Sequence, residues 1–384
     1  MIATSQEPSA GRADNISDPM STPHPRSTVA RMAGYTPGEQ PQPGEKIVKL
    51  NTNENPYPPS PKVFEAIRSI AADSLRRYPQ PMADDFRRVA ARHHGVTPGH
   101  ILAGNGSDDI LQIALRSYCG AGEVLASPDP TYSLYPVLAE LADVRFVTVP
   151  WGADWSLPVD ALLATDPRAI FFANPNAPSG TWVPPADVGA LAARTAALVL
   201  VDEAYVDFAD ADCMGLLALH DNVLISRTLS KGYGLAGLRF GYAVAHPSII
   251  EQMAKVKDSY NCDAIAIAAA CAALEDQAYA RQQWALVRSE RARLTAELER
   301  RGFSVLPSRG NFVLATTPGA ACARPLYDAL KMRGVLVRFF DKPGLSDRLR
   351  VTVGTPEENG AMLAALDAAM GDSGSETKSV SNLA

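Results

Sequence analysis

The middle of the chain, residues 101–244, alternates between short apolar runs and segments with the composition of helices. The runs at 169–173 and 197–201 are apolar throughout, and a stretch long enough for a helix, 186–195, lies between them. Such runs indicate strands buried on both faces, and strands that alternate with helices form a mostly parallel sheet between helices. We therefore expect an α/β fold, with ligands bound at the carboxyl ends of the strands.

A lysine surrounded by hydroxyls and glycines follows a further apolar run, at 222–225. Residues 226–242 read Ser-Arg-Thr-Leu-Ser-Lys-Gly-Tyr-Gly-Leu-Ala-Gly-Leu-Arg-Phe-Gly-Tyr, and they contain Lys231 and Arg239. A lysine that forms a Schiff base must be able to lose its proton, and a phosphate site needs hydroxyls, backbone N–H groups and an arginine. The segment offers both sets of groups. Taken alone, it is equally compatible with a solvated loop.

A second candidate for anion binding lies near the start of this region. The run at 101–103 is followed by Gly-Asn-Gly and then by Ser107 and Asp108, which begin a helix-like segment. Small residues let the backbone approach an anion, and the free N–H groups at a helix start can hold it. The alternative is an ordinary strand-to-helix turn capped by a serine or an aspartate.

Two further polar residues follow strand-like runs. Asp202 comes directly after the run at 197–201, where its carboxylate is partly removed from water and needs a cationic or N–H partner to stay charged. A protonated ring nitrogen would be such a partner. Tyr132 follows the run at 123–127, where its ring could cover a flat cofactor, although a lone aromatic residue is more often simple packing.

Length, charge and cysteine content limit the alternatives. A chain of 384 residues that is 46% hydrophobic can bury a large core and favours two domains. The net charge of −6 argues against a nucleic-acid partner. No apolar run approaches the length of a membrane span, and residues 1–30 lack the apolar core of a signal peptide, so we expect a cytoplasmic protein without a membrane partner. The five cysteines include no Cys-x-x-Cys pair, and we expect neither disulfides nor a metal site.

Changes in composition suggest two domains between two tails. Both ends of the chain are rich in serine and charge without periodicity and are expected to be disordered. After the long amphipathic helix expected at 282–301, short strands are expected at 303–306, 311–315, 335–338 and 348–353 around a helix at 323–333, which indicates a smaller α+β domain. The expected segments are a tail at 1–28, a segment at 29–58 that joins the small domain, a large domain at 59–270, a small domain at 271–370 and a tail at 371–384.

Three motifs, taken together, match one family. They are Asp202-Glu-Ala-Tyr205, then Ser-Arg-Thr-Leu-Ser-Lys231 with Gly-Leu-Ala-Gly-Leu-Arg239 after it, and finally Leu-Arg350-Val-Thr-Val-Gly-Thr. In their order and spacing the chain resembles the pyridoxal-phosphate-dependent aminotransferases of fold type I, and among these it looks most like the histidinol-phosphate aminotransferases. The resemblance covers residues 35–369. It implies pyridoxal 5′-phosphate as the cofactor.

The resemblance also implies roles for individual residues. Lys231 would form the Schiff base with the cofactor and then move the proton between the substrate and the cofactor. Asp202 would pair with the pyridinium nitrogen. Tyr205 and Asn176 would contact the phenolic oxygen of the ring, and Tyr132 would stack on it. The residues that would hold the cofactor phosphate are Ser107, Asp108, Thr228, Ser230 and Arg239.

One departure from the family pattern concerns the ring oxygen. Family members often read Asn-Asn-Pro-Thr-Gly where this chain has Asn-Ala-Pro-Ser-Gly, residues 176–180. If the contact belongs to the second asparagine, it is missing here. We assign the contact to Asn176.

Four residues match substrate-binding and subunit-sharing positions of the family. Arg350 would bind the α-carboxylate of the amino-acid substrate, and Arg338 the substrate phosphate. The alternative for Arg338 is a surface charge at a strand end. Tyr35 would lie near the substrate. Tyr78 would reach the cofactor phosphate of a neighbouring subunit, which implies a homodimer with shared active sites.

We therefore expect an aminotransferase that interconverts histidinol phosphate and imidazole acetol phosphate, with glutamate and 2-oxoglutarate as the second pair, by a ping-pong mechanism in histidine biosynthesis. One alternative is an aromatic amino acid aminotransferase, which would turn over phenylalanine or tyrosine. A second is a decarboxylase of the threonine-phosphate type, which would release carbon dioxide. A cofactor-binding regulator would require a nucleic-acid-binding domain, for which the N-terminal tail has no room.

Overall fold

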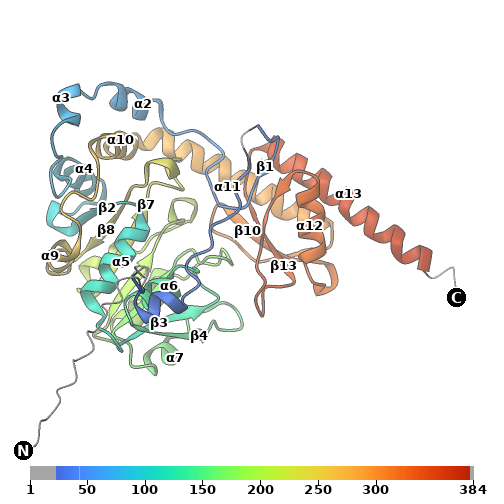
Figure 1. Cartoon of the computed structure of the whole chain (residues 1–384), viewed down its shortest axis with the longest axis horizontal. Coiled ribbons are helices and arrows are strands. Elements are labelled where there is room, and N and C mark those ends of the chain that lie inside the picture. The colour runs from blue at the N-terminus through green and yellow to red at the C-terminus, as the bar shows by residue number, and fades with distance from the viewer. Residues whose placement is uncertain (1–22, 43, 381–384) are drawn as a thin grey trace, which may run out of the picture.

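A computed structural model describes residues 23–42 and 44–380, and a large sheet lies at the centre of its larger domain (Figure 1). Its strands are β2 (Ile101–Gly104), β3 (Val124–Asp129), β4 (Arg145–Pro150), β5 (Ala169–Ala173), β6 (Leu198–Asp202), β7 (Val223–Thr228) and β8 (Gly241–Ala245). Within the described residues the sheet has seven strands in the order β2-β8-β7-β6-β5-β3-β4. Only β8 runs antiparallel to its neighbours, β2 and β7. The expected mostly parallel sheet is confirmed.

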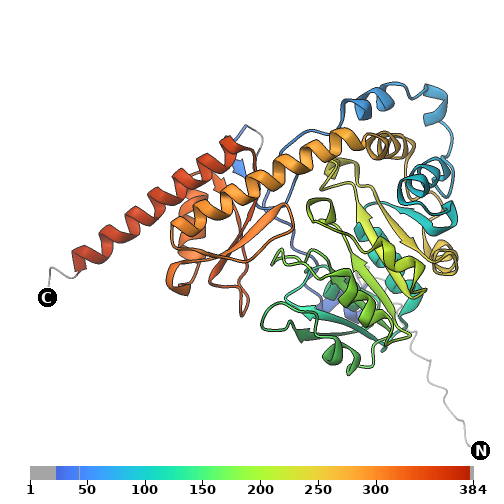
Figure 2. The same cartoon turned by 180° about the vertical axis from the view of Figure 1, so that it is seen from behind.

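Helices cover both faces of this sheet (Figures 1 and 2). Successive residues of a strand point to opposite faces, so Phe171 and Phe172 on β5 enter two different cores. Phe171 packs with the helices of one face, and Phe172 with those of the other. The first group is α5 (Ser107–Tyr118), α6 (Tyr135–Leu141) and α9 (Pro247–Val256), and the second is α7 (Val159–Leu163) and α8 (Pro185–Ala192).

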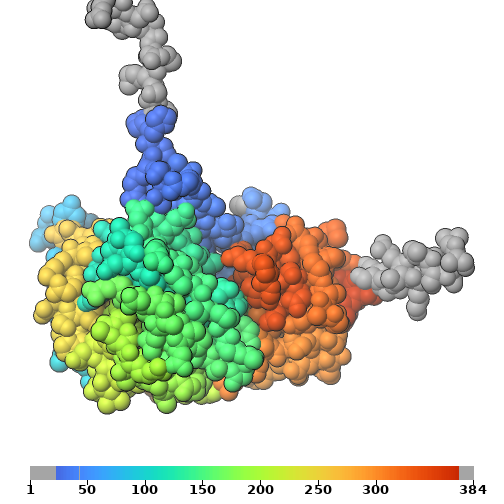
Figure 3. All heavy atoms as spheres, turned by 90° about the horizontal axis from the view of Figure 1, so that it is seen from below, coloured from blue at the N-terminus to red at the C-terminus, as the bar shows by residue number. Residues whose placement is uncertain are grey.

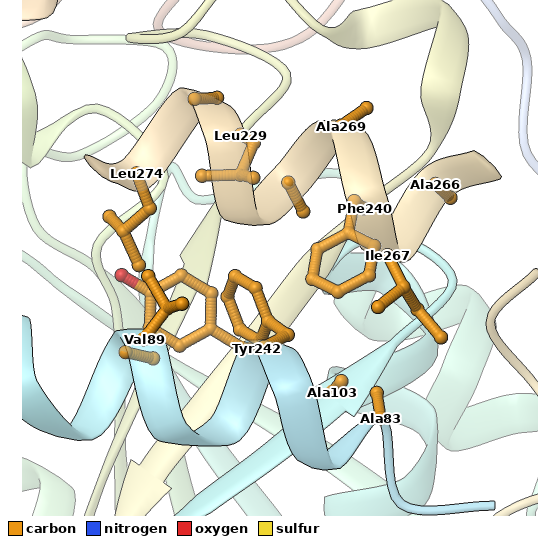
Figure 4. Close-up of a cluster of buried hydrophobic side chains, with 14 of the residues drawn as sticks. Ala83, Val89, Ala103, Leu229, Phe240, Tyr242, Ala266, Ile267, Ala269 and Leu274 are labelled. Carbon is orange, nitrogen blue, oxygen red and sulfur yellow. The ribbon is translucent and has the colours of Figure 1, made fainter. Parts of the chain in front are cut away.

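A further core forms at the β2 and β8 end of the sheet. Figure 4 shows Phe240 and Tyr242 between two helices, α4 (Asp84–His94) and α10 (Ala264–Glu275). The side chains of Phe240 and Tyr242 are 0% and 2% exposed, so these rings fill the space between the helices. The helix α2 (Pro61–Arg68) packs on α10, and a short helix, α3 (Ala72–Leu75), follows it.

Local sequence explains where several of these helices begin. Pro61 occupies the first turn of α2, and the Ser60 hydroxyl accepts a hydrogen bond of 3.2 Å from the backbone N–H of Lys62, as expected for an N-cap. Asp263 caps α10 in the same way, accepting from the N–H of Ala266 at 2.8 Å.

The smaller domain contains two further sheets. The strands β1 (Val48–Lys49) and β11 (Val335–Leu336) pair in parallel. The other sheet has the order β12-β13-β10-β9, with β9 (Ser304–Val305), β10 (Phe312–Thr316), β12 (Arg338–Phe339) and β13 (Arg348–Thr352) all antiparallel. The sequence predicted one strand at 335–338. The chain instead leaves one sheet after Leu336 and enters the other at Arg338, with Val337 buried between them.

One long helix, α11 (Gln277–Arg300), belongs to both domains (Figures 1 and 2). Ala280 near its start lies in the core around α4 and α10. Val287, Leu294 and Leu298 lie in the core of the small domain, together with side chains of β10 and β13. The change from one core to the other therefore falls within α11, beyond the boundary after residue 270 that the sequence suggested.

The segment before α2 packs against the small domain. Leu50 is 1% exposed in the small-domain core, directly after β1. Earlier in the chain, α1 (Ser27–Arg31) forms part of a ridge that stands out from the body of the molecule, drawn in blue in Figure 3. The Arg26 guanidinium donates to the carbonyl of Leu141 at 2.9 Å, and the Thr28 hydroxyl to Asp143 at 2.7 Å. Residues 26–28 therefore contact the large domain, although the sequence placed them in a tail.

Most of the expected N-terminal tail, 1–28, lies outside the described residues, whereas only residues 381–384 of the expected C-terminal tail do. The last helix is α13 (Pro356–Val380), which packs on α12 (Arg324–Met332). It continues into the expected C-terminal tail at 371–384. No proline follows Pro356 in the sequence, so no proline ring interrupts the backbone hydrogen bonds of this helix. Among residues 23–42 and 44–380, no helix is long and apolar enough to cross a membrane.

Candidate active site

A cavity of about 380 Å³ opens at the carboxyl ends of the large-sheet strands, where the two domains meet. Its walls come from the ends of β5, β6 and β7, from the start of α5, from the segment before α2, and from β12 and β13. All but two of the residues predicted for the site line it, namely Tyr35, Ser107, Asp108, Tyr132, Asp202, Tyr205, Thr228, Ser230, Lys231, Arg239, Arg338 and Arg350. Strand ends therefore collect side chains that are far apart in the sequence.

Lys231 enters the cavity just after β7. Its Nζ atom donates a hydrogen bond of 3.0 Å to the backbone carbonyl of Thr52 and lies 5.9 Å from the centre of the Tyr205 ring. Burial, and then the nearby positive charge of Arg350, lower the pKa of Lys231 to about 8. Because only the neutral amine is a nucleophile, this environment prepares the lysine for attack on a carbonyl carbon near neutral pH.

Asp202 ends β6 and is 3% exposed. One carboxylate oxygen, Oδ2, accepts a hydrogen bond of 3.1 Å from the hydroxyl of Tyr135. The other, Oδ1, is buried without a hydrogen-bond partner among the described residues. Burial raises the pKa of Asp202 to about 7, against the lowering effect of the Tyr135 bond. A cationic donor placed against Oδ1 would satisfy this atom and keep the carboxylate charged.

The start of α5 and the segment after β7 form an anion site. Arg239 lies beside the first turn of α5, where its Nη2 atom is 3.3 Å from the carboxylate of Asp108 and its Nη1 atom is 3.3 Å from the hydroxyl of Ser230. The backbone N–H of Ser230 donates to the hydroxyl of Thr228 at 3.1 Å. Gly106 makes the approach possible, since a Cβ atom there would lie 2.7 Å from the Arg239 guanidinium. Helix N–H groups, hydroxyls and an arginine are the groups that bind phosphate.

Two arginines face each other on the small-domain side of the cavity. Arg338 on β12 and Arg350 on β13 are direct cross-strand partners. Arg350 donates to the backbone carbonyl of Asn51 at 2.9 Å, and its guanidinium lies 5.3 Å from the Phe312 ring centre and 5.6 Å from that of Phe340. Its Nε atom is buried without a hydrogen-bond partner in the described part of the chain. Like charges directly opposite each other are unfavourable, so this pair favours an anionic ligand.

Comparison with known proteins places this geometry in a family. The sequence profile described as "Aminotransferase class I and II" matches residues 45–366. The chain belongs to the class I and II aminotransferases. The expected family and fold class are thereby confirmed.

Named relatives of this aminotransferase agree with the profile. It is 45% identical to histidinol-phosphate aminotransferase 1 of Trichormus variabilis over 341 residues, which cover 89% of this chain and 97% of the relative. It is 44% identical to the histidinol-phosphate aminotransferase of Rhodopirellula baltica over 347 residues, 90% and 95% of the two chains.

Solved structures share the architecture. The histidinol-phosphate aminotransferase of Sinorhizobium meliloti, in complex with pyridoxal 5′-phosphate, superposes with a TM-score of 0.80 and 31% identity and covers 86% of this chain and 92% of its own. A mutant aspartate aminotransferase of Thermus thermophilus, 21% identical with a TM-score of 0.76 over 90% and 98% of the two chains, shares the fold.

Two predicted residues of this aminotransferase do not line the cavity. The amide of Asn176 donates to the carbonyl of Pro130 at 3.1 Å and to the hydroxyl of Ser179 at 2.8 Å, so it holds its own turn. Its neighbour Ala177 lines the cavity instead. The assignment of the ring contact to Asn176 therefore needs correction, because the cavity-lining position carries an alanine without a polar group.

Tyr78 is the second residue outside the cavity. It is 80% exposed and stacks on Tyr260, with ring centres 4.4 Å apart. This position leaves its ring accessible to another molecule, and its role in a neighbouring subunit remains a prediction.

Several residues at the site escaped the sequence analysis. The loop Asn51-Thr-Asn-Glu-Asn-Pro reads as an ordinary polar turn, yet it contacts Lys231 from two sides. Thr52 accepts from its amine, and the amide of Asn55 donates to the carbonyls of Lys231 at 2.9 Å and Gly232 at 3.2 Å. The available signal was the repetition of asparagine, whose side chain can pair with backbone groups. Nothing local indicated which backbone groups these would be.

Proposed function

We propose that this aminotransferase uses pyridoxal 5′-phosphate to interconvert histidinol phosphate and imidazole acetol phosphate, with glutamate and 2-oxoglutarate as the second pair, in a ping-pong cycle. The observation that carries the proposal is a cavity lined by Lys231, by Asp202, whose Oδ1 atom has no partner among the described residues, and by the arginines 338 and 350. The names of the relatives support the choice of substrate. The proposal places the enzyme in the cytoplasm.

The residues of the large domain fit the cofactor. When bound, pyridoxal phosphate supplies an aldehyde carbon that an amine can attack and a ring that accepts electrons. Asp202 would hold a protonated ring nitrogen through Oδ1, the buried oxygen that lacks a partner among the described residues. The start of α5, with Ser107, Ser230 and Arg239, would hold the phosphate. Tyr132 would cover the ring.

Lys231 carries the chemical steps that a side chain must perform. Its lowered pKa makes the neutral amine available for bond formation with the cofactor. When it is free, the same amine would take the proton from the substrate α carbon and deliver it to the cofactor. In the cavity its amine lies between the backbone carbonyl of Thr52 and the ring of Tyr205.

The facing arginines account for two kinds of substrate. Glutamate and 2-oxoglutarate carry an α-carboxylate, which the Arg350 guanidinium, with its buried and unpaired Nε atom, would bind. Histidinol phosphate has no α-carboxylate and carries a phosphate instead. Arg338 would bind this phosphate, and Lys342 lines the same part of the cavity. A phosphate dianion between these cations would relieve the repulsion of the arginine pair.

The substrate assignment is tested by spectra of the purified protein loaded with pyridoxal phosphate. We expect a low concentration of histidinol phosphate to convert the cofactor to its amine form, and phenylalanine to do so only weakly. The substitution Arg338→Gln should raise the KM for histidinol phosphate about tenfold or more, since an ionic hydrogen bond contributes roughly 1.5–3 kcal/mol, and should leave glutamate less affected. Arg145→Gln, at an exposed position on the edge strand β4, is the matched control.

Each alternative activity gives a different result in this experiment. Equal conversion by phenylalanine would assign the enzyme to aromatic amino acids. Release of carbon dioxide from threonine phosphate would assign it to the decarboxylases.

We also propose a homodimer in which Tyr78 serves the active site of the neighbouring subunit. Its exposed ring and the exposed side chains of Phe64 and Leu75 support a contact surface here. The test mixes two inactive variants, Lys231→Ala and Tyr78→Ala, after partial denaturation and refolding. Mixed dimers would regain part of the activity, because one of their two sites combines an intact lysine with an intact tyrosine. Absence of any recovery in mixtures that sedimentation shows to be dimeric would contradict shared sites.

A further inference from the structure

Asn53 occupies a fixed place between the two domains. It is 1% exposed and has a left-handed backbone, with φ of +55°. Its backbone N–H donates to the Thr352 hydroxyl at 3.0 Å, and its carbonyl accepts from the amide of Asn311 at 3.0 Å. Its side-chain oxygen accepts from the same Thr352 hydroxyl at 3.1 Å, and its side-chain nitrogen donates to the Tyr205 hydroxyl at 3.0 Å. The amide therefore joins β13 of the small domain to the end of β6.

This arrangement sets the direction of the Tyr205 hydroxyl hydrogen. Thr352 accepts one hydrogen bond from Asn53 and uses its own hydrogen for the amide oxygen, which leaves the amide nitrogen toward Tyr205. A hydroxyl that accepts from an amide N–H keeps its hydrogen for another acceptor. Tyr205 lines the cavity, so that acceptor lies on the cavity side.

Burial keeps Tyr205 a phenol by raising its pKa. Burial is the main cause of its raised pKa, and Asp202 and Tyr35 act in the same direction. Arg350 and the Asn53 hydrogen bond lower the pKa without reversing the shift. The hydroxyl is therefore able to donate throughout the physiological range.

We propose that Asn53 is a positioning residue, which turns the Tyr205 hydroxyl hydrogen into the cavity and ties it to the strand that carries Arg350. The inference rests on the proposed function, in which this hydroxyl donates to the phenolic oxygen of the cofactor. Thr352 and Arg350 are two residues apart on β13 and point to the same face. One threonine and one amide thus connect the strand that carries Arg350 to the tyrosine.

The test is a titration of the absorbance of the cofactor bound at Lys231, which reports the pKa of the lysine nitrogen. A hydrogen bond from Tyr205 stabilises the anionic ring oxygen, which then holds the proton of the lysine nitrogen less strongly. Loss of the hydrogen bond should therefore raise the pKa of the lysine nitrogen. We expect Tyr205→Phe and Asn53→Asp to raise it by about one pH unit each, the equivalent of one hydrogen bond. The aspartate tolerates the left-handed backbone but accepts from the tyrosine, which turns the hydrogen away from the cavity.

A double variant separates this effect from the added charge. In the Tyr205→Phe background, Asn53→Asp should cause little further rise, because the hydroxyl is already absent. A rise of the same size with and without the hydroxyl would mean that the charge alone acts, and would overturn the inference.

A second pair of variants adds no charge. Thr352→Val releases the amide and should raise the pKa in the same direction, whereas Thr352→Ser keeps the hydroxyl and should leave it unchanged. If Thr352→Val titrates like the wild-type protein, the inference is overturned. The result for Tyr205→Phe would still show the role of the tyrosine. If the wild-type protein shows no cofactor absorbance at all, the proposed function fails, and the inference fails with it.

Discussion

Tyr135 donates a hydrogen bond of 3.1 Å to one carboxylate oxygen of Asp202, and the other oxygen is buried beside the cavity without a partner among the described residues. The tyrosine is fully buried on α6, so the bond holds the carboxylate plane in one orientation. The unpaired oxygen is the one left for a ligand.

The substitution Tyr135→Phe should weaken cofactor binding. The Asp202 pKa, already raised by burial, should rise further when the lowering effect of this bond is lost. Because a hydrogen bond to a charged group contributes roughly 1.5–3 kcal/mol, we expect the Kd for pyridoxal phosphate to rise about tenfold or more. Fluorescence titration of the cofactor-free protein measures it. Tyr118→Phe, on α5, is the control, and an equal loss of affinity in the control would refute a specific role for Tyr135.

Recombination of the cofactor-free protein with pyridoxal phosphate should depend on pH through Lys231. Only the neutral amine reacts, so the rate should rise with pH, with a midpoint near the lowered pKa of about 8, and level off above it. Arg350→Gln removes a positive charge that lowers the Lys231 pKa, so its midpoint should lie at higher pH. Stopped-flow absorbance follows the reaction. A midpoint close to that of an ordinary lysine would disprove the effect of burial.

Gly241→Ala should damage the anion site. A Cβ atom there would lie 2.4 Å from the backbone nitrogen of Ser107 and 2.5 Å from the carbonyl carbon of Gly106, so the start of α5 would have to move. We expect overpacking of this kind to lower the free energy of unfolding by about 1–3 kcal/mol and to weaken cofactor binding. Gly237→Ala is the matched control, since a Cβ atom there meets nothing within 4 Å. Thermal unfolding with and without cofactor compares the two, and equal behaviour would contradict the geometry.

Arg227→Gln should be strongly destabilising. The Arg227 guanidinium lies 2.8 Å from the carboxylate of Glu203, and both side chains are almost entirely buried. Removal of one partner leaves an uncompensated buried charge, which costs about 3–5 kcal/mol. The double variant Arg227→Gln with Glu203→Gln should recover part of this loss in urea denaturation. Additive losses in the double variant would show that the two residues do not act as a pair.

The sequence was sufficient to predict the large sheet and the side chains at its strand ends that line the cavity. Apolar runs such as 169–173 identify buried strands without any tertiary information, and Asp202 follows such a run directly, while Lys231 lies in the polar segment after another. Since the carboxyl ends of parallel strands meet at one edge, residues found at several strand ends were bound to meet. The resemblance of the motifs to the aminotransferases then suggested the chemistry of these residues.

The contacts of Asn53 could not be predicted in this way. Its partner Thr352 lies 299 residues away in the sequence, and no periodicity links an amide in a loop to a hydroxyl on a distant strand. The ring contact was assigned to Asn176 for a related reason. Its amide could pair either with a ligand or with its own turn, and only the three-dimensional arrangement decides between them. The break at Val337 was hidden because residues 335–340 read Val-Leu-Val-Arg-Phe-Phe, without a glycine or proline to mark a change of sheet.

The shared helix α11 makes the chain indivisible. A fragment cut at residue 270 would lose Ala280 from the core between the helices α4 and α10, while the complementary fragment would begin with helical turns whose packing surface had been removed. Neither piece could bury the side chains it inherited. The enzyme should therefore melt as one cooperative unit and resist attempts to express its domains separately.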